Sequence, residues 1–344
     1  MTAFWIHARH AIPNSRSISF SSLYDRRRLL NSISMLIGSA CLLLAFLSVP
    51  LHAQTIEDGI MVHKANLFTG PVYTYSYWNK YWEGTRQRTN ENIGTVITQS
   101  ATWYADYGLT NRWNVIASVP YVWTRATQGV LHGMSGFQDI TLAAKYDFYH
   151  HSFSDVGDLR FIGVVAGSLP LSGYTPDFQP LSIGFDSKQI STRLTVNFQT
   201  RPGWFVNGSA AYTWRGDVTL DRPYYFTENQ LFMINQVAMP NVFNGIVNAG
   251  YLKNGLMAQV TFARQNMDGG GDIRRQDAPF VSNRVNYSNV GGMVMYSLPI
   301  LNPRSLAFKF QFDYTVDGRN VGQAKTFTSG LFYTFNFSGK GPTQ

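Results

Sequence analysis

The chain has 344 residues, of which 14% are charged and 15% are aromatic, and its mean hydropathy is -0.13. A soluble globular protein carries about 25% charged residues, and this composition excludes a coiled coil, a disordered chain and a helical membrane protein. Half of the formal net charge of +8 comes from the first 53 residues, so the remainder lacks the basic excess of a nucleic-acid-binding protein.

The N-terminus has the layout of a secretory signal peptide. Three arginines at 26–28 precede an apolar stretch at 35–47, and Leu51-His52-Ala53 forms a small-residue end. We therefore expect cleavage after Ala53. The alternative, a membrane anchor, needs about 20 apolar residues, and this stretch is shorter. The single cysteine, Cys41, lies inside the leader, so the mature chain would have no disulfide and no thiolate metal ligand.

Apolar and polar residues alternate with period two in many segments after residue 53. In residues 139–148, Ile140 and Leu142 share one face with other apolar residues, whereas Lys145 lies on the opposite, polar face. The same pattern predicts twelve strands, near 70–82, 95–107, 113–124, 138–149, 159–169, 188–199, 204–215, 242–252, 256–265, 287–298, 305–316 and 325–337.

Short and long connections alternate between these strands. The short ones, at 108–112, 200–203, 253–255 and 300–304, have the Asn, Gly and Pro content of turns. The long ones lie near 125–137, 170–187, 216–241 and 266–286. This alternation is typical of a membrane barrel with short turns on one side and long loops on the other. Residues 150–158 depart from it as an unusually long turn, and residues 317–324 as an unusually short loop.

These features predict an all-β fold with a single antiparallel transmembrane β-barrel of about twelve strands, short periplasmic turns and longer extracellular loops. Only helices and closed barrels satisfy every backbone group in a bilayer, and a barrel strand crosses in about 9–11 residues. Aromatic residues near strand ends, such as Trp103, Tyr121 and Trp204, suit interfacial girdles. The expected domains are a leader and signal peptide at 1–53, a periplasmic segment at 54–69 and the barrel at 70–344. A soluble β protein is the competing interpretation.

The last strand alternates aromatic and small residues and includes Tyr333, Phe335 and Phe337. Outer-membrane barrels commonly end on such a strand, which the barrel-assembly machinery recognises, so this machinery is an expected partner. Residues 338–344 follow the final aromatic residue and depart from that pattern. We therefore expect export to the outer membrane of a Gram-negative bacterium.

Two segments resemble a known family. Residues 107–113 (YGLTNRW), followed by VPYV at 119–122, are similar to a YGLTDRW…VPYV hairpin, and residues 136–146 (GFQDITLAAKY) are similar to a GxGDxxLxAKY strand. Both occur in outer-membrane barrels of the phenol-degradation meta-pathway family, often called transporters. Asn111 stands where the family usually has Asp. The resemblance implies a barrel linked to the uptake of aromatic or hydrophobic compounds.

The sequence offers little catalytic chemistry. His150 and His151 are adjacent in a predicted turn, and neighbouring strand residues would point to opposite faces, so they form a poor metal chelate. A barrel-rim hydrolase built on His132, Ser135 and Asp139 remains a remote alternative, because no Gly-x-Ser-x-Gly elbow occurs. We expect no enzyme, no metal and no cofactor.

Alternation also places charged residues of both signs in the lumen. Besides Lys80, the candidate lumen-lining residues are Asp106, Asp139, Lys145, Asp147, Arg160, Arg193, Arg215, Lys309 and Asp313. They would either form a salt-bridged network that fills a narrow barrel or line a selective path. Apolar residues are also predicted to face inward, namely Ile162, Val164, Met293, Met295 and Phe332.

This mixture predicts passive uptake of small hydrophobic or aromatic solutes, gated by a loop or by residues 54–69. A closed structural or surface-interaction barrel is the main alternative. The expected partners are the small-molecule solute, outer-membrane lipid and lipopolysaccharide, the last through loop arginines such as Arg86, Arg88 and Arg274; nucleic acid is not expected.

Overall fold

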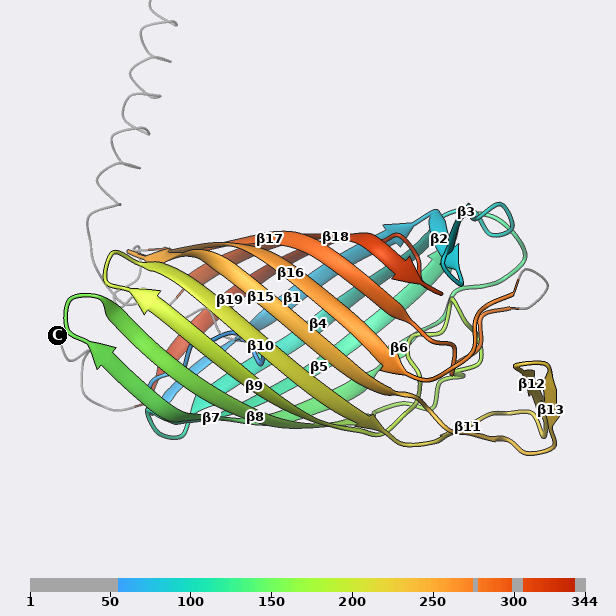
Figure 1. Cartoon of the computed structure of the whole chain (residues 1–344), viewed down its shortest axis with the longest axis horizontal. Helices are drawn as coiled ribbons and strands as arrows, with labels where there is room; N and C mark the ends of the chain where they lie inside the picture. The colour runs from blue at the N-terminus through green and yellow to red at the C-terminus, as the bar shows by residue number, and fades with distance from the viewer. Residues whose placement is uncertain (1–54, 275–277, 299–305, 338–344) are drawn as a thin grey trace, which may run out of the picture. The chain divides into compact units, whose positions relative to one another are not determined.

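The computed structural model describes residues 55–274, 278–298 and 306–337. Long antiparallel strands, each paired with the next along the chain, form the wall of a barrel (Figure 1). Pairing of β1 with β19 on one side and with β4 on the other closes the ring. The predicted leader at 1–53, the turn at 300–304 and residues 338–344 lie outside the described residues.

Twelve wall strands are present in this described part, as the alternation predicts. They are β1 (Asn66–Trp78), β4 (Val96–Gly108), β5 (Trp113–Ala126), β7 (Asp139–Phe153), β8 (Gly157–Pro170), β9 (Gln189–Thr200), β10 (Trp204–Arg215), β15 (Asn241–Lys253), β16 (Leu256–Asp268), β17 (Asn286–Leu298), β18 (Leu306–Arg319) and β19 (Lys325–Asn336). Each overlaps one predicted range, and β10 has the predicted bounds. The predicted fold class is confirmed.

The connections divide the barrel into two unlike ends, here named the short-turn end and the long-loop end. Seven short strands lie in the connections at the long-loop end: β2 (Lys80–Glu83), β3 (Arg86–Thr89), β6 (Ser135–Phe137), β11 (Val218–Thr219), β12 (Tyr225–Thr227), β13 (Gln230–Phe232) and β14 (Gln236–Val237). The interpretation of Lys80 as lumen-facing is wrong, because β1 ends at Trp78 and Lys80 is an exposed residue that begins the β2–β3 hairpin.

The predicted long turn at 150–158 is shorter in the structure. β7 continues to Phe153 and β8 begins at Gly157, which leaves a turn of residues 154–156. The register shifts between Asp147 and Tyr149, so the side-chain alternation on which the sequence prediction depended is interrupted there. His150 and His151 are therefore strand residues rather than turn residues.

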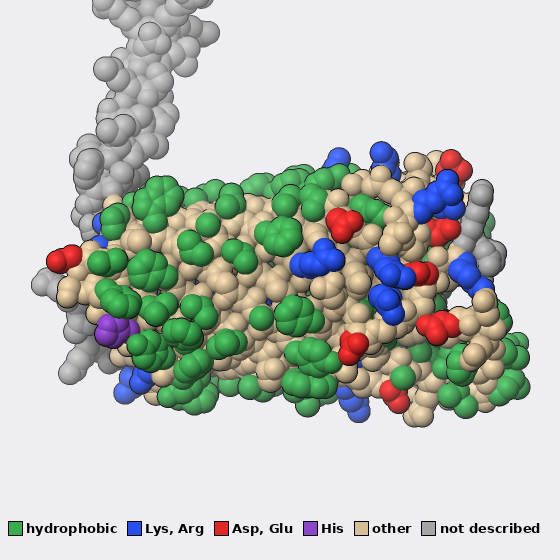
Figure 2. Space-filling view, in the orientation of Figure 1, with side chains coloured by type: hydrophobic (Ala, Val, Ile, Leu, Met, Phe, Trp, Pro, Cys, Tyr) green, Lys and Arg blue, Asp and Glu red, His purple; other side chains and the backbone are tan. Residues whose placement is uncertain are grey.

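The outer wall is apolar. On β18, Phe308 and Phe310 are 49% and 55% exposed. Their neighbour Ala307, which points into the barrel, is only 3% exposed. Figure 2 shows hydrophobic side chains spread over the barrel wall, with most charged side chains towards the long-loop end. Aromatic pairs lie near both ends, including Trp204–Tyr251 at the short-turn end and Tyr212–Trp214 at the long-loop end. No helix in the described ranges is long and apolar enough to cross a membrane.

Two apolar clusters occupy the interior. The first contains Val62, Phe68, Phe205, Leu252, Met257, Met293, Met295, Ala307 and Phe332. The second contains Met61, Ile116, Ala143, Ile162, Val164 and Ala166. Met61 and Val62 belong to no strand, so the chain that precedes β1 packs inside the ring. The expected boundary between segment and barrel, at residue 70, falls within β1.

Candidate functional site

The residues before β1, 55–65, lie in the lumen, and we refer to them as the N-terminal segment. Its end next to β1 is fastened at the short-turn end, where Lys64 N donates to Asn111 Oδ1 (3.0 Å) and Ala65 N donates to Gly108 O (2.8 Å). A Cβ on Gly59 would lie 2.3 Å from Cβ of Asn197 on β9. Glycine therefore allows the segment to lie directly against the wall.

Lys145 holds the start of this segment. Its Nζ donates to the backbone oxygen of Thr55 and to Oδ1 of Asp58, both at 2.8 Å, and the Lys145 side chain is fully buried. Asp58 also accepts hydrogen bonds from the backbone N–H groups of Thr55 and Ile60, which turn the segment around this carboxylate. The ammonium thus has a specific set of oxygen partners, as a buried charge requires.

Arg193 forms a second polar attachment. Its guanidinium donates to Ser209 Oγ (2.7 Å) and Asn244 Oδ1 (3.2 Å) on neighbouring strands, and it lies 3.5 Å from Oε1 of Glu57. The two wall residues fix the position of the guanidinium, so Glu57 meets a pre-positioned cation. Two predicted lumen-lining cations, Lys145 and Arg193, therefore bind consecutive acidic residues of the segment.

The segment is also anchored by apolar packing. Met61 and Val62 are 4% and 1% exposed, and they enter the second and the first interior cluster respectively. The two adjacent side chains thus pack into different clusters, and the segment is held against both. Burying side chains of this size contributes about 1.5–3 kcal/mol each.

A partly open cavity of about 310 Å³ lies beside residues 55–58 of the segment. One part of its wall is apolar and includes Phe68 and Phe332, whose rings stack at 4.5 Å, with Tyr104 edge-on to Phe332 at 6.2 Å. The rest is polar and includes the amides Asn248, Gln259 and Gln311 and the ammonium of Lys309. A volume of about 300–1,000 Å³ with few polar groups is typical of small-molecule sites.

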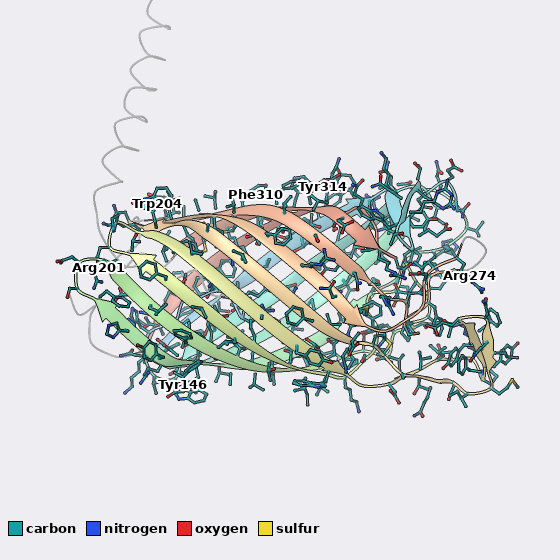
Figure 3. All side chains as sticks on the ribbon, viewed as in Figure 1. Tyr146, Arg201, Trp204, Arg274, Phe310 and Tyr314 are labelled. Carbon is teal, nitrogen blue, oxygen red and sulfur yellow. The ribbon has the colours of Figure 1, made fainter. Side chains whose placement is uncertain are left out.

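Lys309 reaches this cavity because it alternates with lipid-facing residues on β18. Phe310 and Tyr314 of the same strand lie on the outer face (Figure 3). Asp313 lies on the inward face and accepts a hydrogen bond from Gln311 Nε2 at 2.8 Å. The structure thus places Lys309 at the cavity and Asp313 beyond it.

The other predicted lumen-lining residues lie apart from the cavity wall. Asp106 is fully buried and accepts a hydrogen bond from Asn114 Nδ2 at 3.0 Å. Asp147 is buried near the short-turn end, with Arg160 Nη1 at 4.0 Å from its Oδ2. Arg215 packs over Phe185, 5.3 Å from the ring centre, at the long-loop end. The nine residues therefore do not form one continuous network.

Asp139 has a partner in a long loop rather than a histidine. Tyr174 Oη donates to Asp139 Oδ1 at 2.6 Å, and it also accepts from Asp186 N at 3.0 Å. Burial, together with the hydrogen bond to Asp139 and its charge, raises the pKa of Tyr174 above the usual value. The loop at 171–188 is thereby tied to the start of β7.

A polar latch joins three connections at the long-loop end, and we define it by Asn320, Asp272 and Arg319. Asn320 accepts hydrogen bonds from Gly84 N and Ile273 N, both at 2.9 Å, and donates to Asp272 Oδ1 at 2.8 Å. Arg319 donates to both oxygens of Asp272, at 2.7 and 2.6 Å. These hydrogen bonds, from Arg319 first and Asn320 second, lower the pKa of the Asp272 carboxyl.

The sequence interpretation missed Glu57, Asp58, Met61 and Val62. They lie in a segment without alternation, so no periodic signal assigned them to the interior. Two consecutive acids followed by an apolar run were the available signal, but their partners Lys145 and Arg193 are far away in the sequence.

A closed twelve-stranded barrel with an apolar outer wall and a cavity in its lumen has the architecture of outer-membrane channels. A family model described as "Putative MetA-pathway of phenol degradation" matches residues 73–332. The chain belongs to this family, which confirms the resemblance seen in residues 107–113 and 136–146. A comparison with curated proteins found no match.

The chain was also compared with solved structures, and the first of those below shares its fold. The COG4313 outer membrane channel from Pseudomonas putida F1 is 12% identical with a TM-score of 0.63, over 83% of this chain and 100% of that one. The NanC porin is 8% identical with a TM-score of 0.42, over 76% and 98%. The CymD monoaromatic hydrocarbon channel is 10% identical with a TM-score of 0.41, over 80% and 89%.

Proposed function

We propose that this protein is an outer-membrane channel that takes up small hydrophobic or aromatic molecules by passive diffusion through the lumen. The cavity beside the N-terminal segment is the observation that carries the proposal. Its stacked Phe68–Phe332 pair and its methionines offer an apolar surface inside a barrel, where a simple ion pore would have a continuous polar lining.

The N-terminal segment acts as the gate in this proposal. A solute in the cavity contacts residues 55–58 directly. Farther along the segment, Met61 and Val62 pack in the interior. Passage therefore requires the segment to leave its contacts with Lys145 and Arg193 while its far end stays joined to β1. No catalytic step belongs to this function, and the solute leaves chemically unchanged.

The remaining parts of the proposal concern targeting and partners. The protein is exported through its signal peptide, which is cleaved after Ala53, and is inserted through its last strand by the barrel-assembly machinery. Its short-turn end faces the periplasm and its long loops face lipopolysaccharide. The exposed apolar wall and the aromatic pairs at its two ends support insertion in a bilayer.

Planar-bilayer recordings of the purified full-length protein test the gate. We expect a small conductance that phenol reduces in a concentration-dependent way, because phenol occupies the cavity. A variant that lacks residues 55–63 should conduct more and lose the discrete closed periods. Heat-modifiable migration on gels verifies that both proteins are folded barrels.

A second candidate, a closed structural barrel, is favoured by the filling of the interior by the N-terminal segment. It predicts silence in the full-length protein and no effect of phenol on the shortened variant. Conductance without any response to phenol would leave a pore but contradict aromatic uptake.

A further inference from the structure

One charged group that lines the cavity forms no direct ion pair among the described residues. Three charged side chains line it: Glu57, Asp58 and Lys309. Glu57 lies 3.5 Å from Arg193, and Asp58 lies 2.8 Å from Lys145. Within the described ranges, Lys309 has neither an ion-pair partner nor a hydrogen-bond partner, although Glu57, Asp58 and Asp313 lie in its electrostatic neighbourhood. A buried ammonium without a direct hydrogen-bond partner in a largely apolar site is unfavourable unless an anion or water solvates it.

An anion would reach Lys309 from the cavity that this residue lines. Lys309 is opposite Met295 on β17 and opposite Gly330 on β19, and the Phe332 ring lies over the glycine, 2.6 Å from where a Cβ would be. Asp313, on the same strand face, forms no ion pair with Lys309 and accepts a hydrogen bond from Gln311 Nε2. Gln311 and Gln259 also line the cavity, and Gln259 Nε2 already donates to Asn248 Oδ1 and Thr261 Oγ1. A carboxylate there would have the Lys309 ammonium as its ionic partner.

The opposite side of the cavity defines the rest of the ligand. Phe68, Phe332 and the edge-on Tyr104 form an aromatic surface, and Met257 and Met293 extend it. Such a surface binds a compact ring or short alkyl body through dispersion and burial of apolar area. The cavity is therefore amphipathic, with one cationic pole and one aromatic wall.

We propose that the cavity binds a monocarboxylate with a compact apolar or aromatic body, whose carboxylate pairs with Lys309 and whose body packs on Phe68 and Phe332. The proposal rests on the function proposed above, because it assigns a ligand class to the same cavity. It goes further by making the solute an organic acid rather than a neutral hydrocarbon, with Lys309 as the residue that selects charge.

The test uses three probes that share one ring: benzoate, benzyl alcohol and benzylamine. Their binding to the full-length protein is measured by isothermal titration calorimetry at neutral pH. We expect benzoate to bind about tenfold or more tightly than benzyl alcohol, as a charged hydrogen bond provides, and benzylamine to bind most weakly. This comparison needs no variant, so it does not depend on the folding of a mutant.

Variants then assign the preference to one residue. Lys309→Gln should reduce benzoate affinity to that of benzyl alcohol and leave benzyl alcohol binding unchanged, whereas Lys309→Arg should retain the preference. Lys253→Gln is the matched control, because it removes the same charge from the exposed end of β15, where Lys253 Nζ donates to Arg201 O. It should change neither affinity.

The outcomes separate the two proposals. Equal binding of benzoate and benzyl alcohol, or a benzoate preference that survives in Lys309→Gln, overturns the carboxylate proposal and leaves aromatic uptake intact. Absence of binding for all three probes, together with unblocked or absent conductance, overturns both.

Discussion

The two ends of the barrel are held together by different interactions. At the short-turn end the N-terminal segment packs inside the barrel. Its Met61 and Val62 lie in the apolar clusters, and its Glu57 and Asp58 form two ion pairs with the wall. At the long-loop end the connections are joined by hydrogen bonds through the buried Asn320 and the partly exposed Asp272. The first arrangement resembles a protein core, and the second resembles a surface network.

This difference has a functional meaning. Apolar packing with the largely buried Lys145–Asp58 ion pair gives a closed state that opens rarely and as a unit, because removing one of these contacts leaves a buried group without its partner. The partly exposed Arg319–Asp272 ion pair gives the loops at the other end a network that adjusts to pH and salt. The gate and the outer mouth should therefore respond to different perturbations.

Lys145→Met should give the largest effect, because it leaves Asp58 without its cation in the lumen. Breaking a buried ion pair costs about 3–5 kcal/mol, which corresponds to an increase of roughly 100-fold or more in the undocked fraction of the segment. Open probability in planar bilayers measures this change. Lys253→Met is the control, and an unchanged open probability in Lys145→Met would contradict the role of the ion pair in closure.

Met61→Ala should have the next largest effect. It removes apolar contacts with the second interior cluster, and truncation of a buried Met costs about 2–5 kcal/mol. We expect longer open periods and faster cleavage of the segment by a protease added from the short-turn side, with the barrel itself still resistant. Leu109→Ala, at an exposed turn position outside the cluster, serves as the control.

Asn320→Ala should loosen the long-loop end without affecting the gate. It removes the acceptor of Gly84 N and Ile273 N, and a buried group that loses its partner costs about 1–3 kcal/mol. Asn320 has a positive φ of 54°, so Ala also adds backbone strain. Asn320→Gly separates the two effects, because it removes the hydrogen bonds but tolerates this conformation.

Limited proteolysis of the loop at 269–285 measures the result. Cleavage should be faster in both Asn320 variants, with open probability unchanged. A change of open probability in either Asn320 variant would show that the two ends are coupled, and would contradict their independent response.

Acid should produce the smallest effect. The pKa of Asp272 is lowered by Arg319 and Asn320, so its contribution to loop stability is complete above the ordinary carboxyl pKa of 3.8 and is lost as the pH falls through the lowered value. Hydrogen exchange at Ile273 N, corrected for intrinsic rate, should therefore be slow at neutral pH and faster near pH 3. Asp272→Asn should show the fast rate already at neutral pH; a pH-independent rate in the natural protein would contradict this.

The sequence predicts the wall well because the wall is periodic. β10 has the bounds expected from alternation, and the inward or outward direction of Lys309 and Phe310 on β18 follows from the same period. The period is uninformative where it breaks. The register shift after Asp147 made residues 150–158 resemble a turn, and the hairpin that begins at Lys80 resembled a continuation of β1.

The site was less predictable than the wall. Lys145 and Arg193 were recognised as inward cations, but their partners Asp58 and Glu57 precede the first strand and are brought to them only when the ring closes. The unpaired state of Lys309 could not be predicted either, since it depends on where Asp313 and Gln311 point. Which charged side chains form ion pairs depends on how the closed barrel brings distant residues together, and the local sequence pattern does not contain this information.

The covalent link between the N-terminal segment and β1 has a kinetic consequence. The segment is tethered at residues 63–66, where Asn66 N donates to His63 O at 3.1 Å. After undocking, it therefore remains attached to the barrel by a tether of only about ten residues. Its effective concentration is therefore fixed by the tether and does not fall on dilution. A chain of this length closes a loop in about 10–100 ns, so the duration of each opening depends on how long a solute or solvent occupies the vacated lumen.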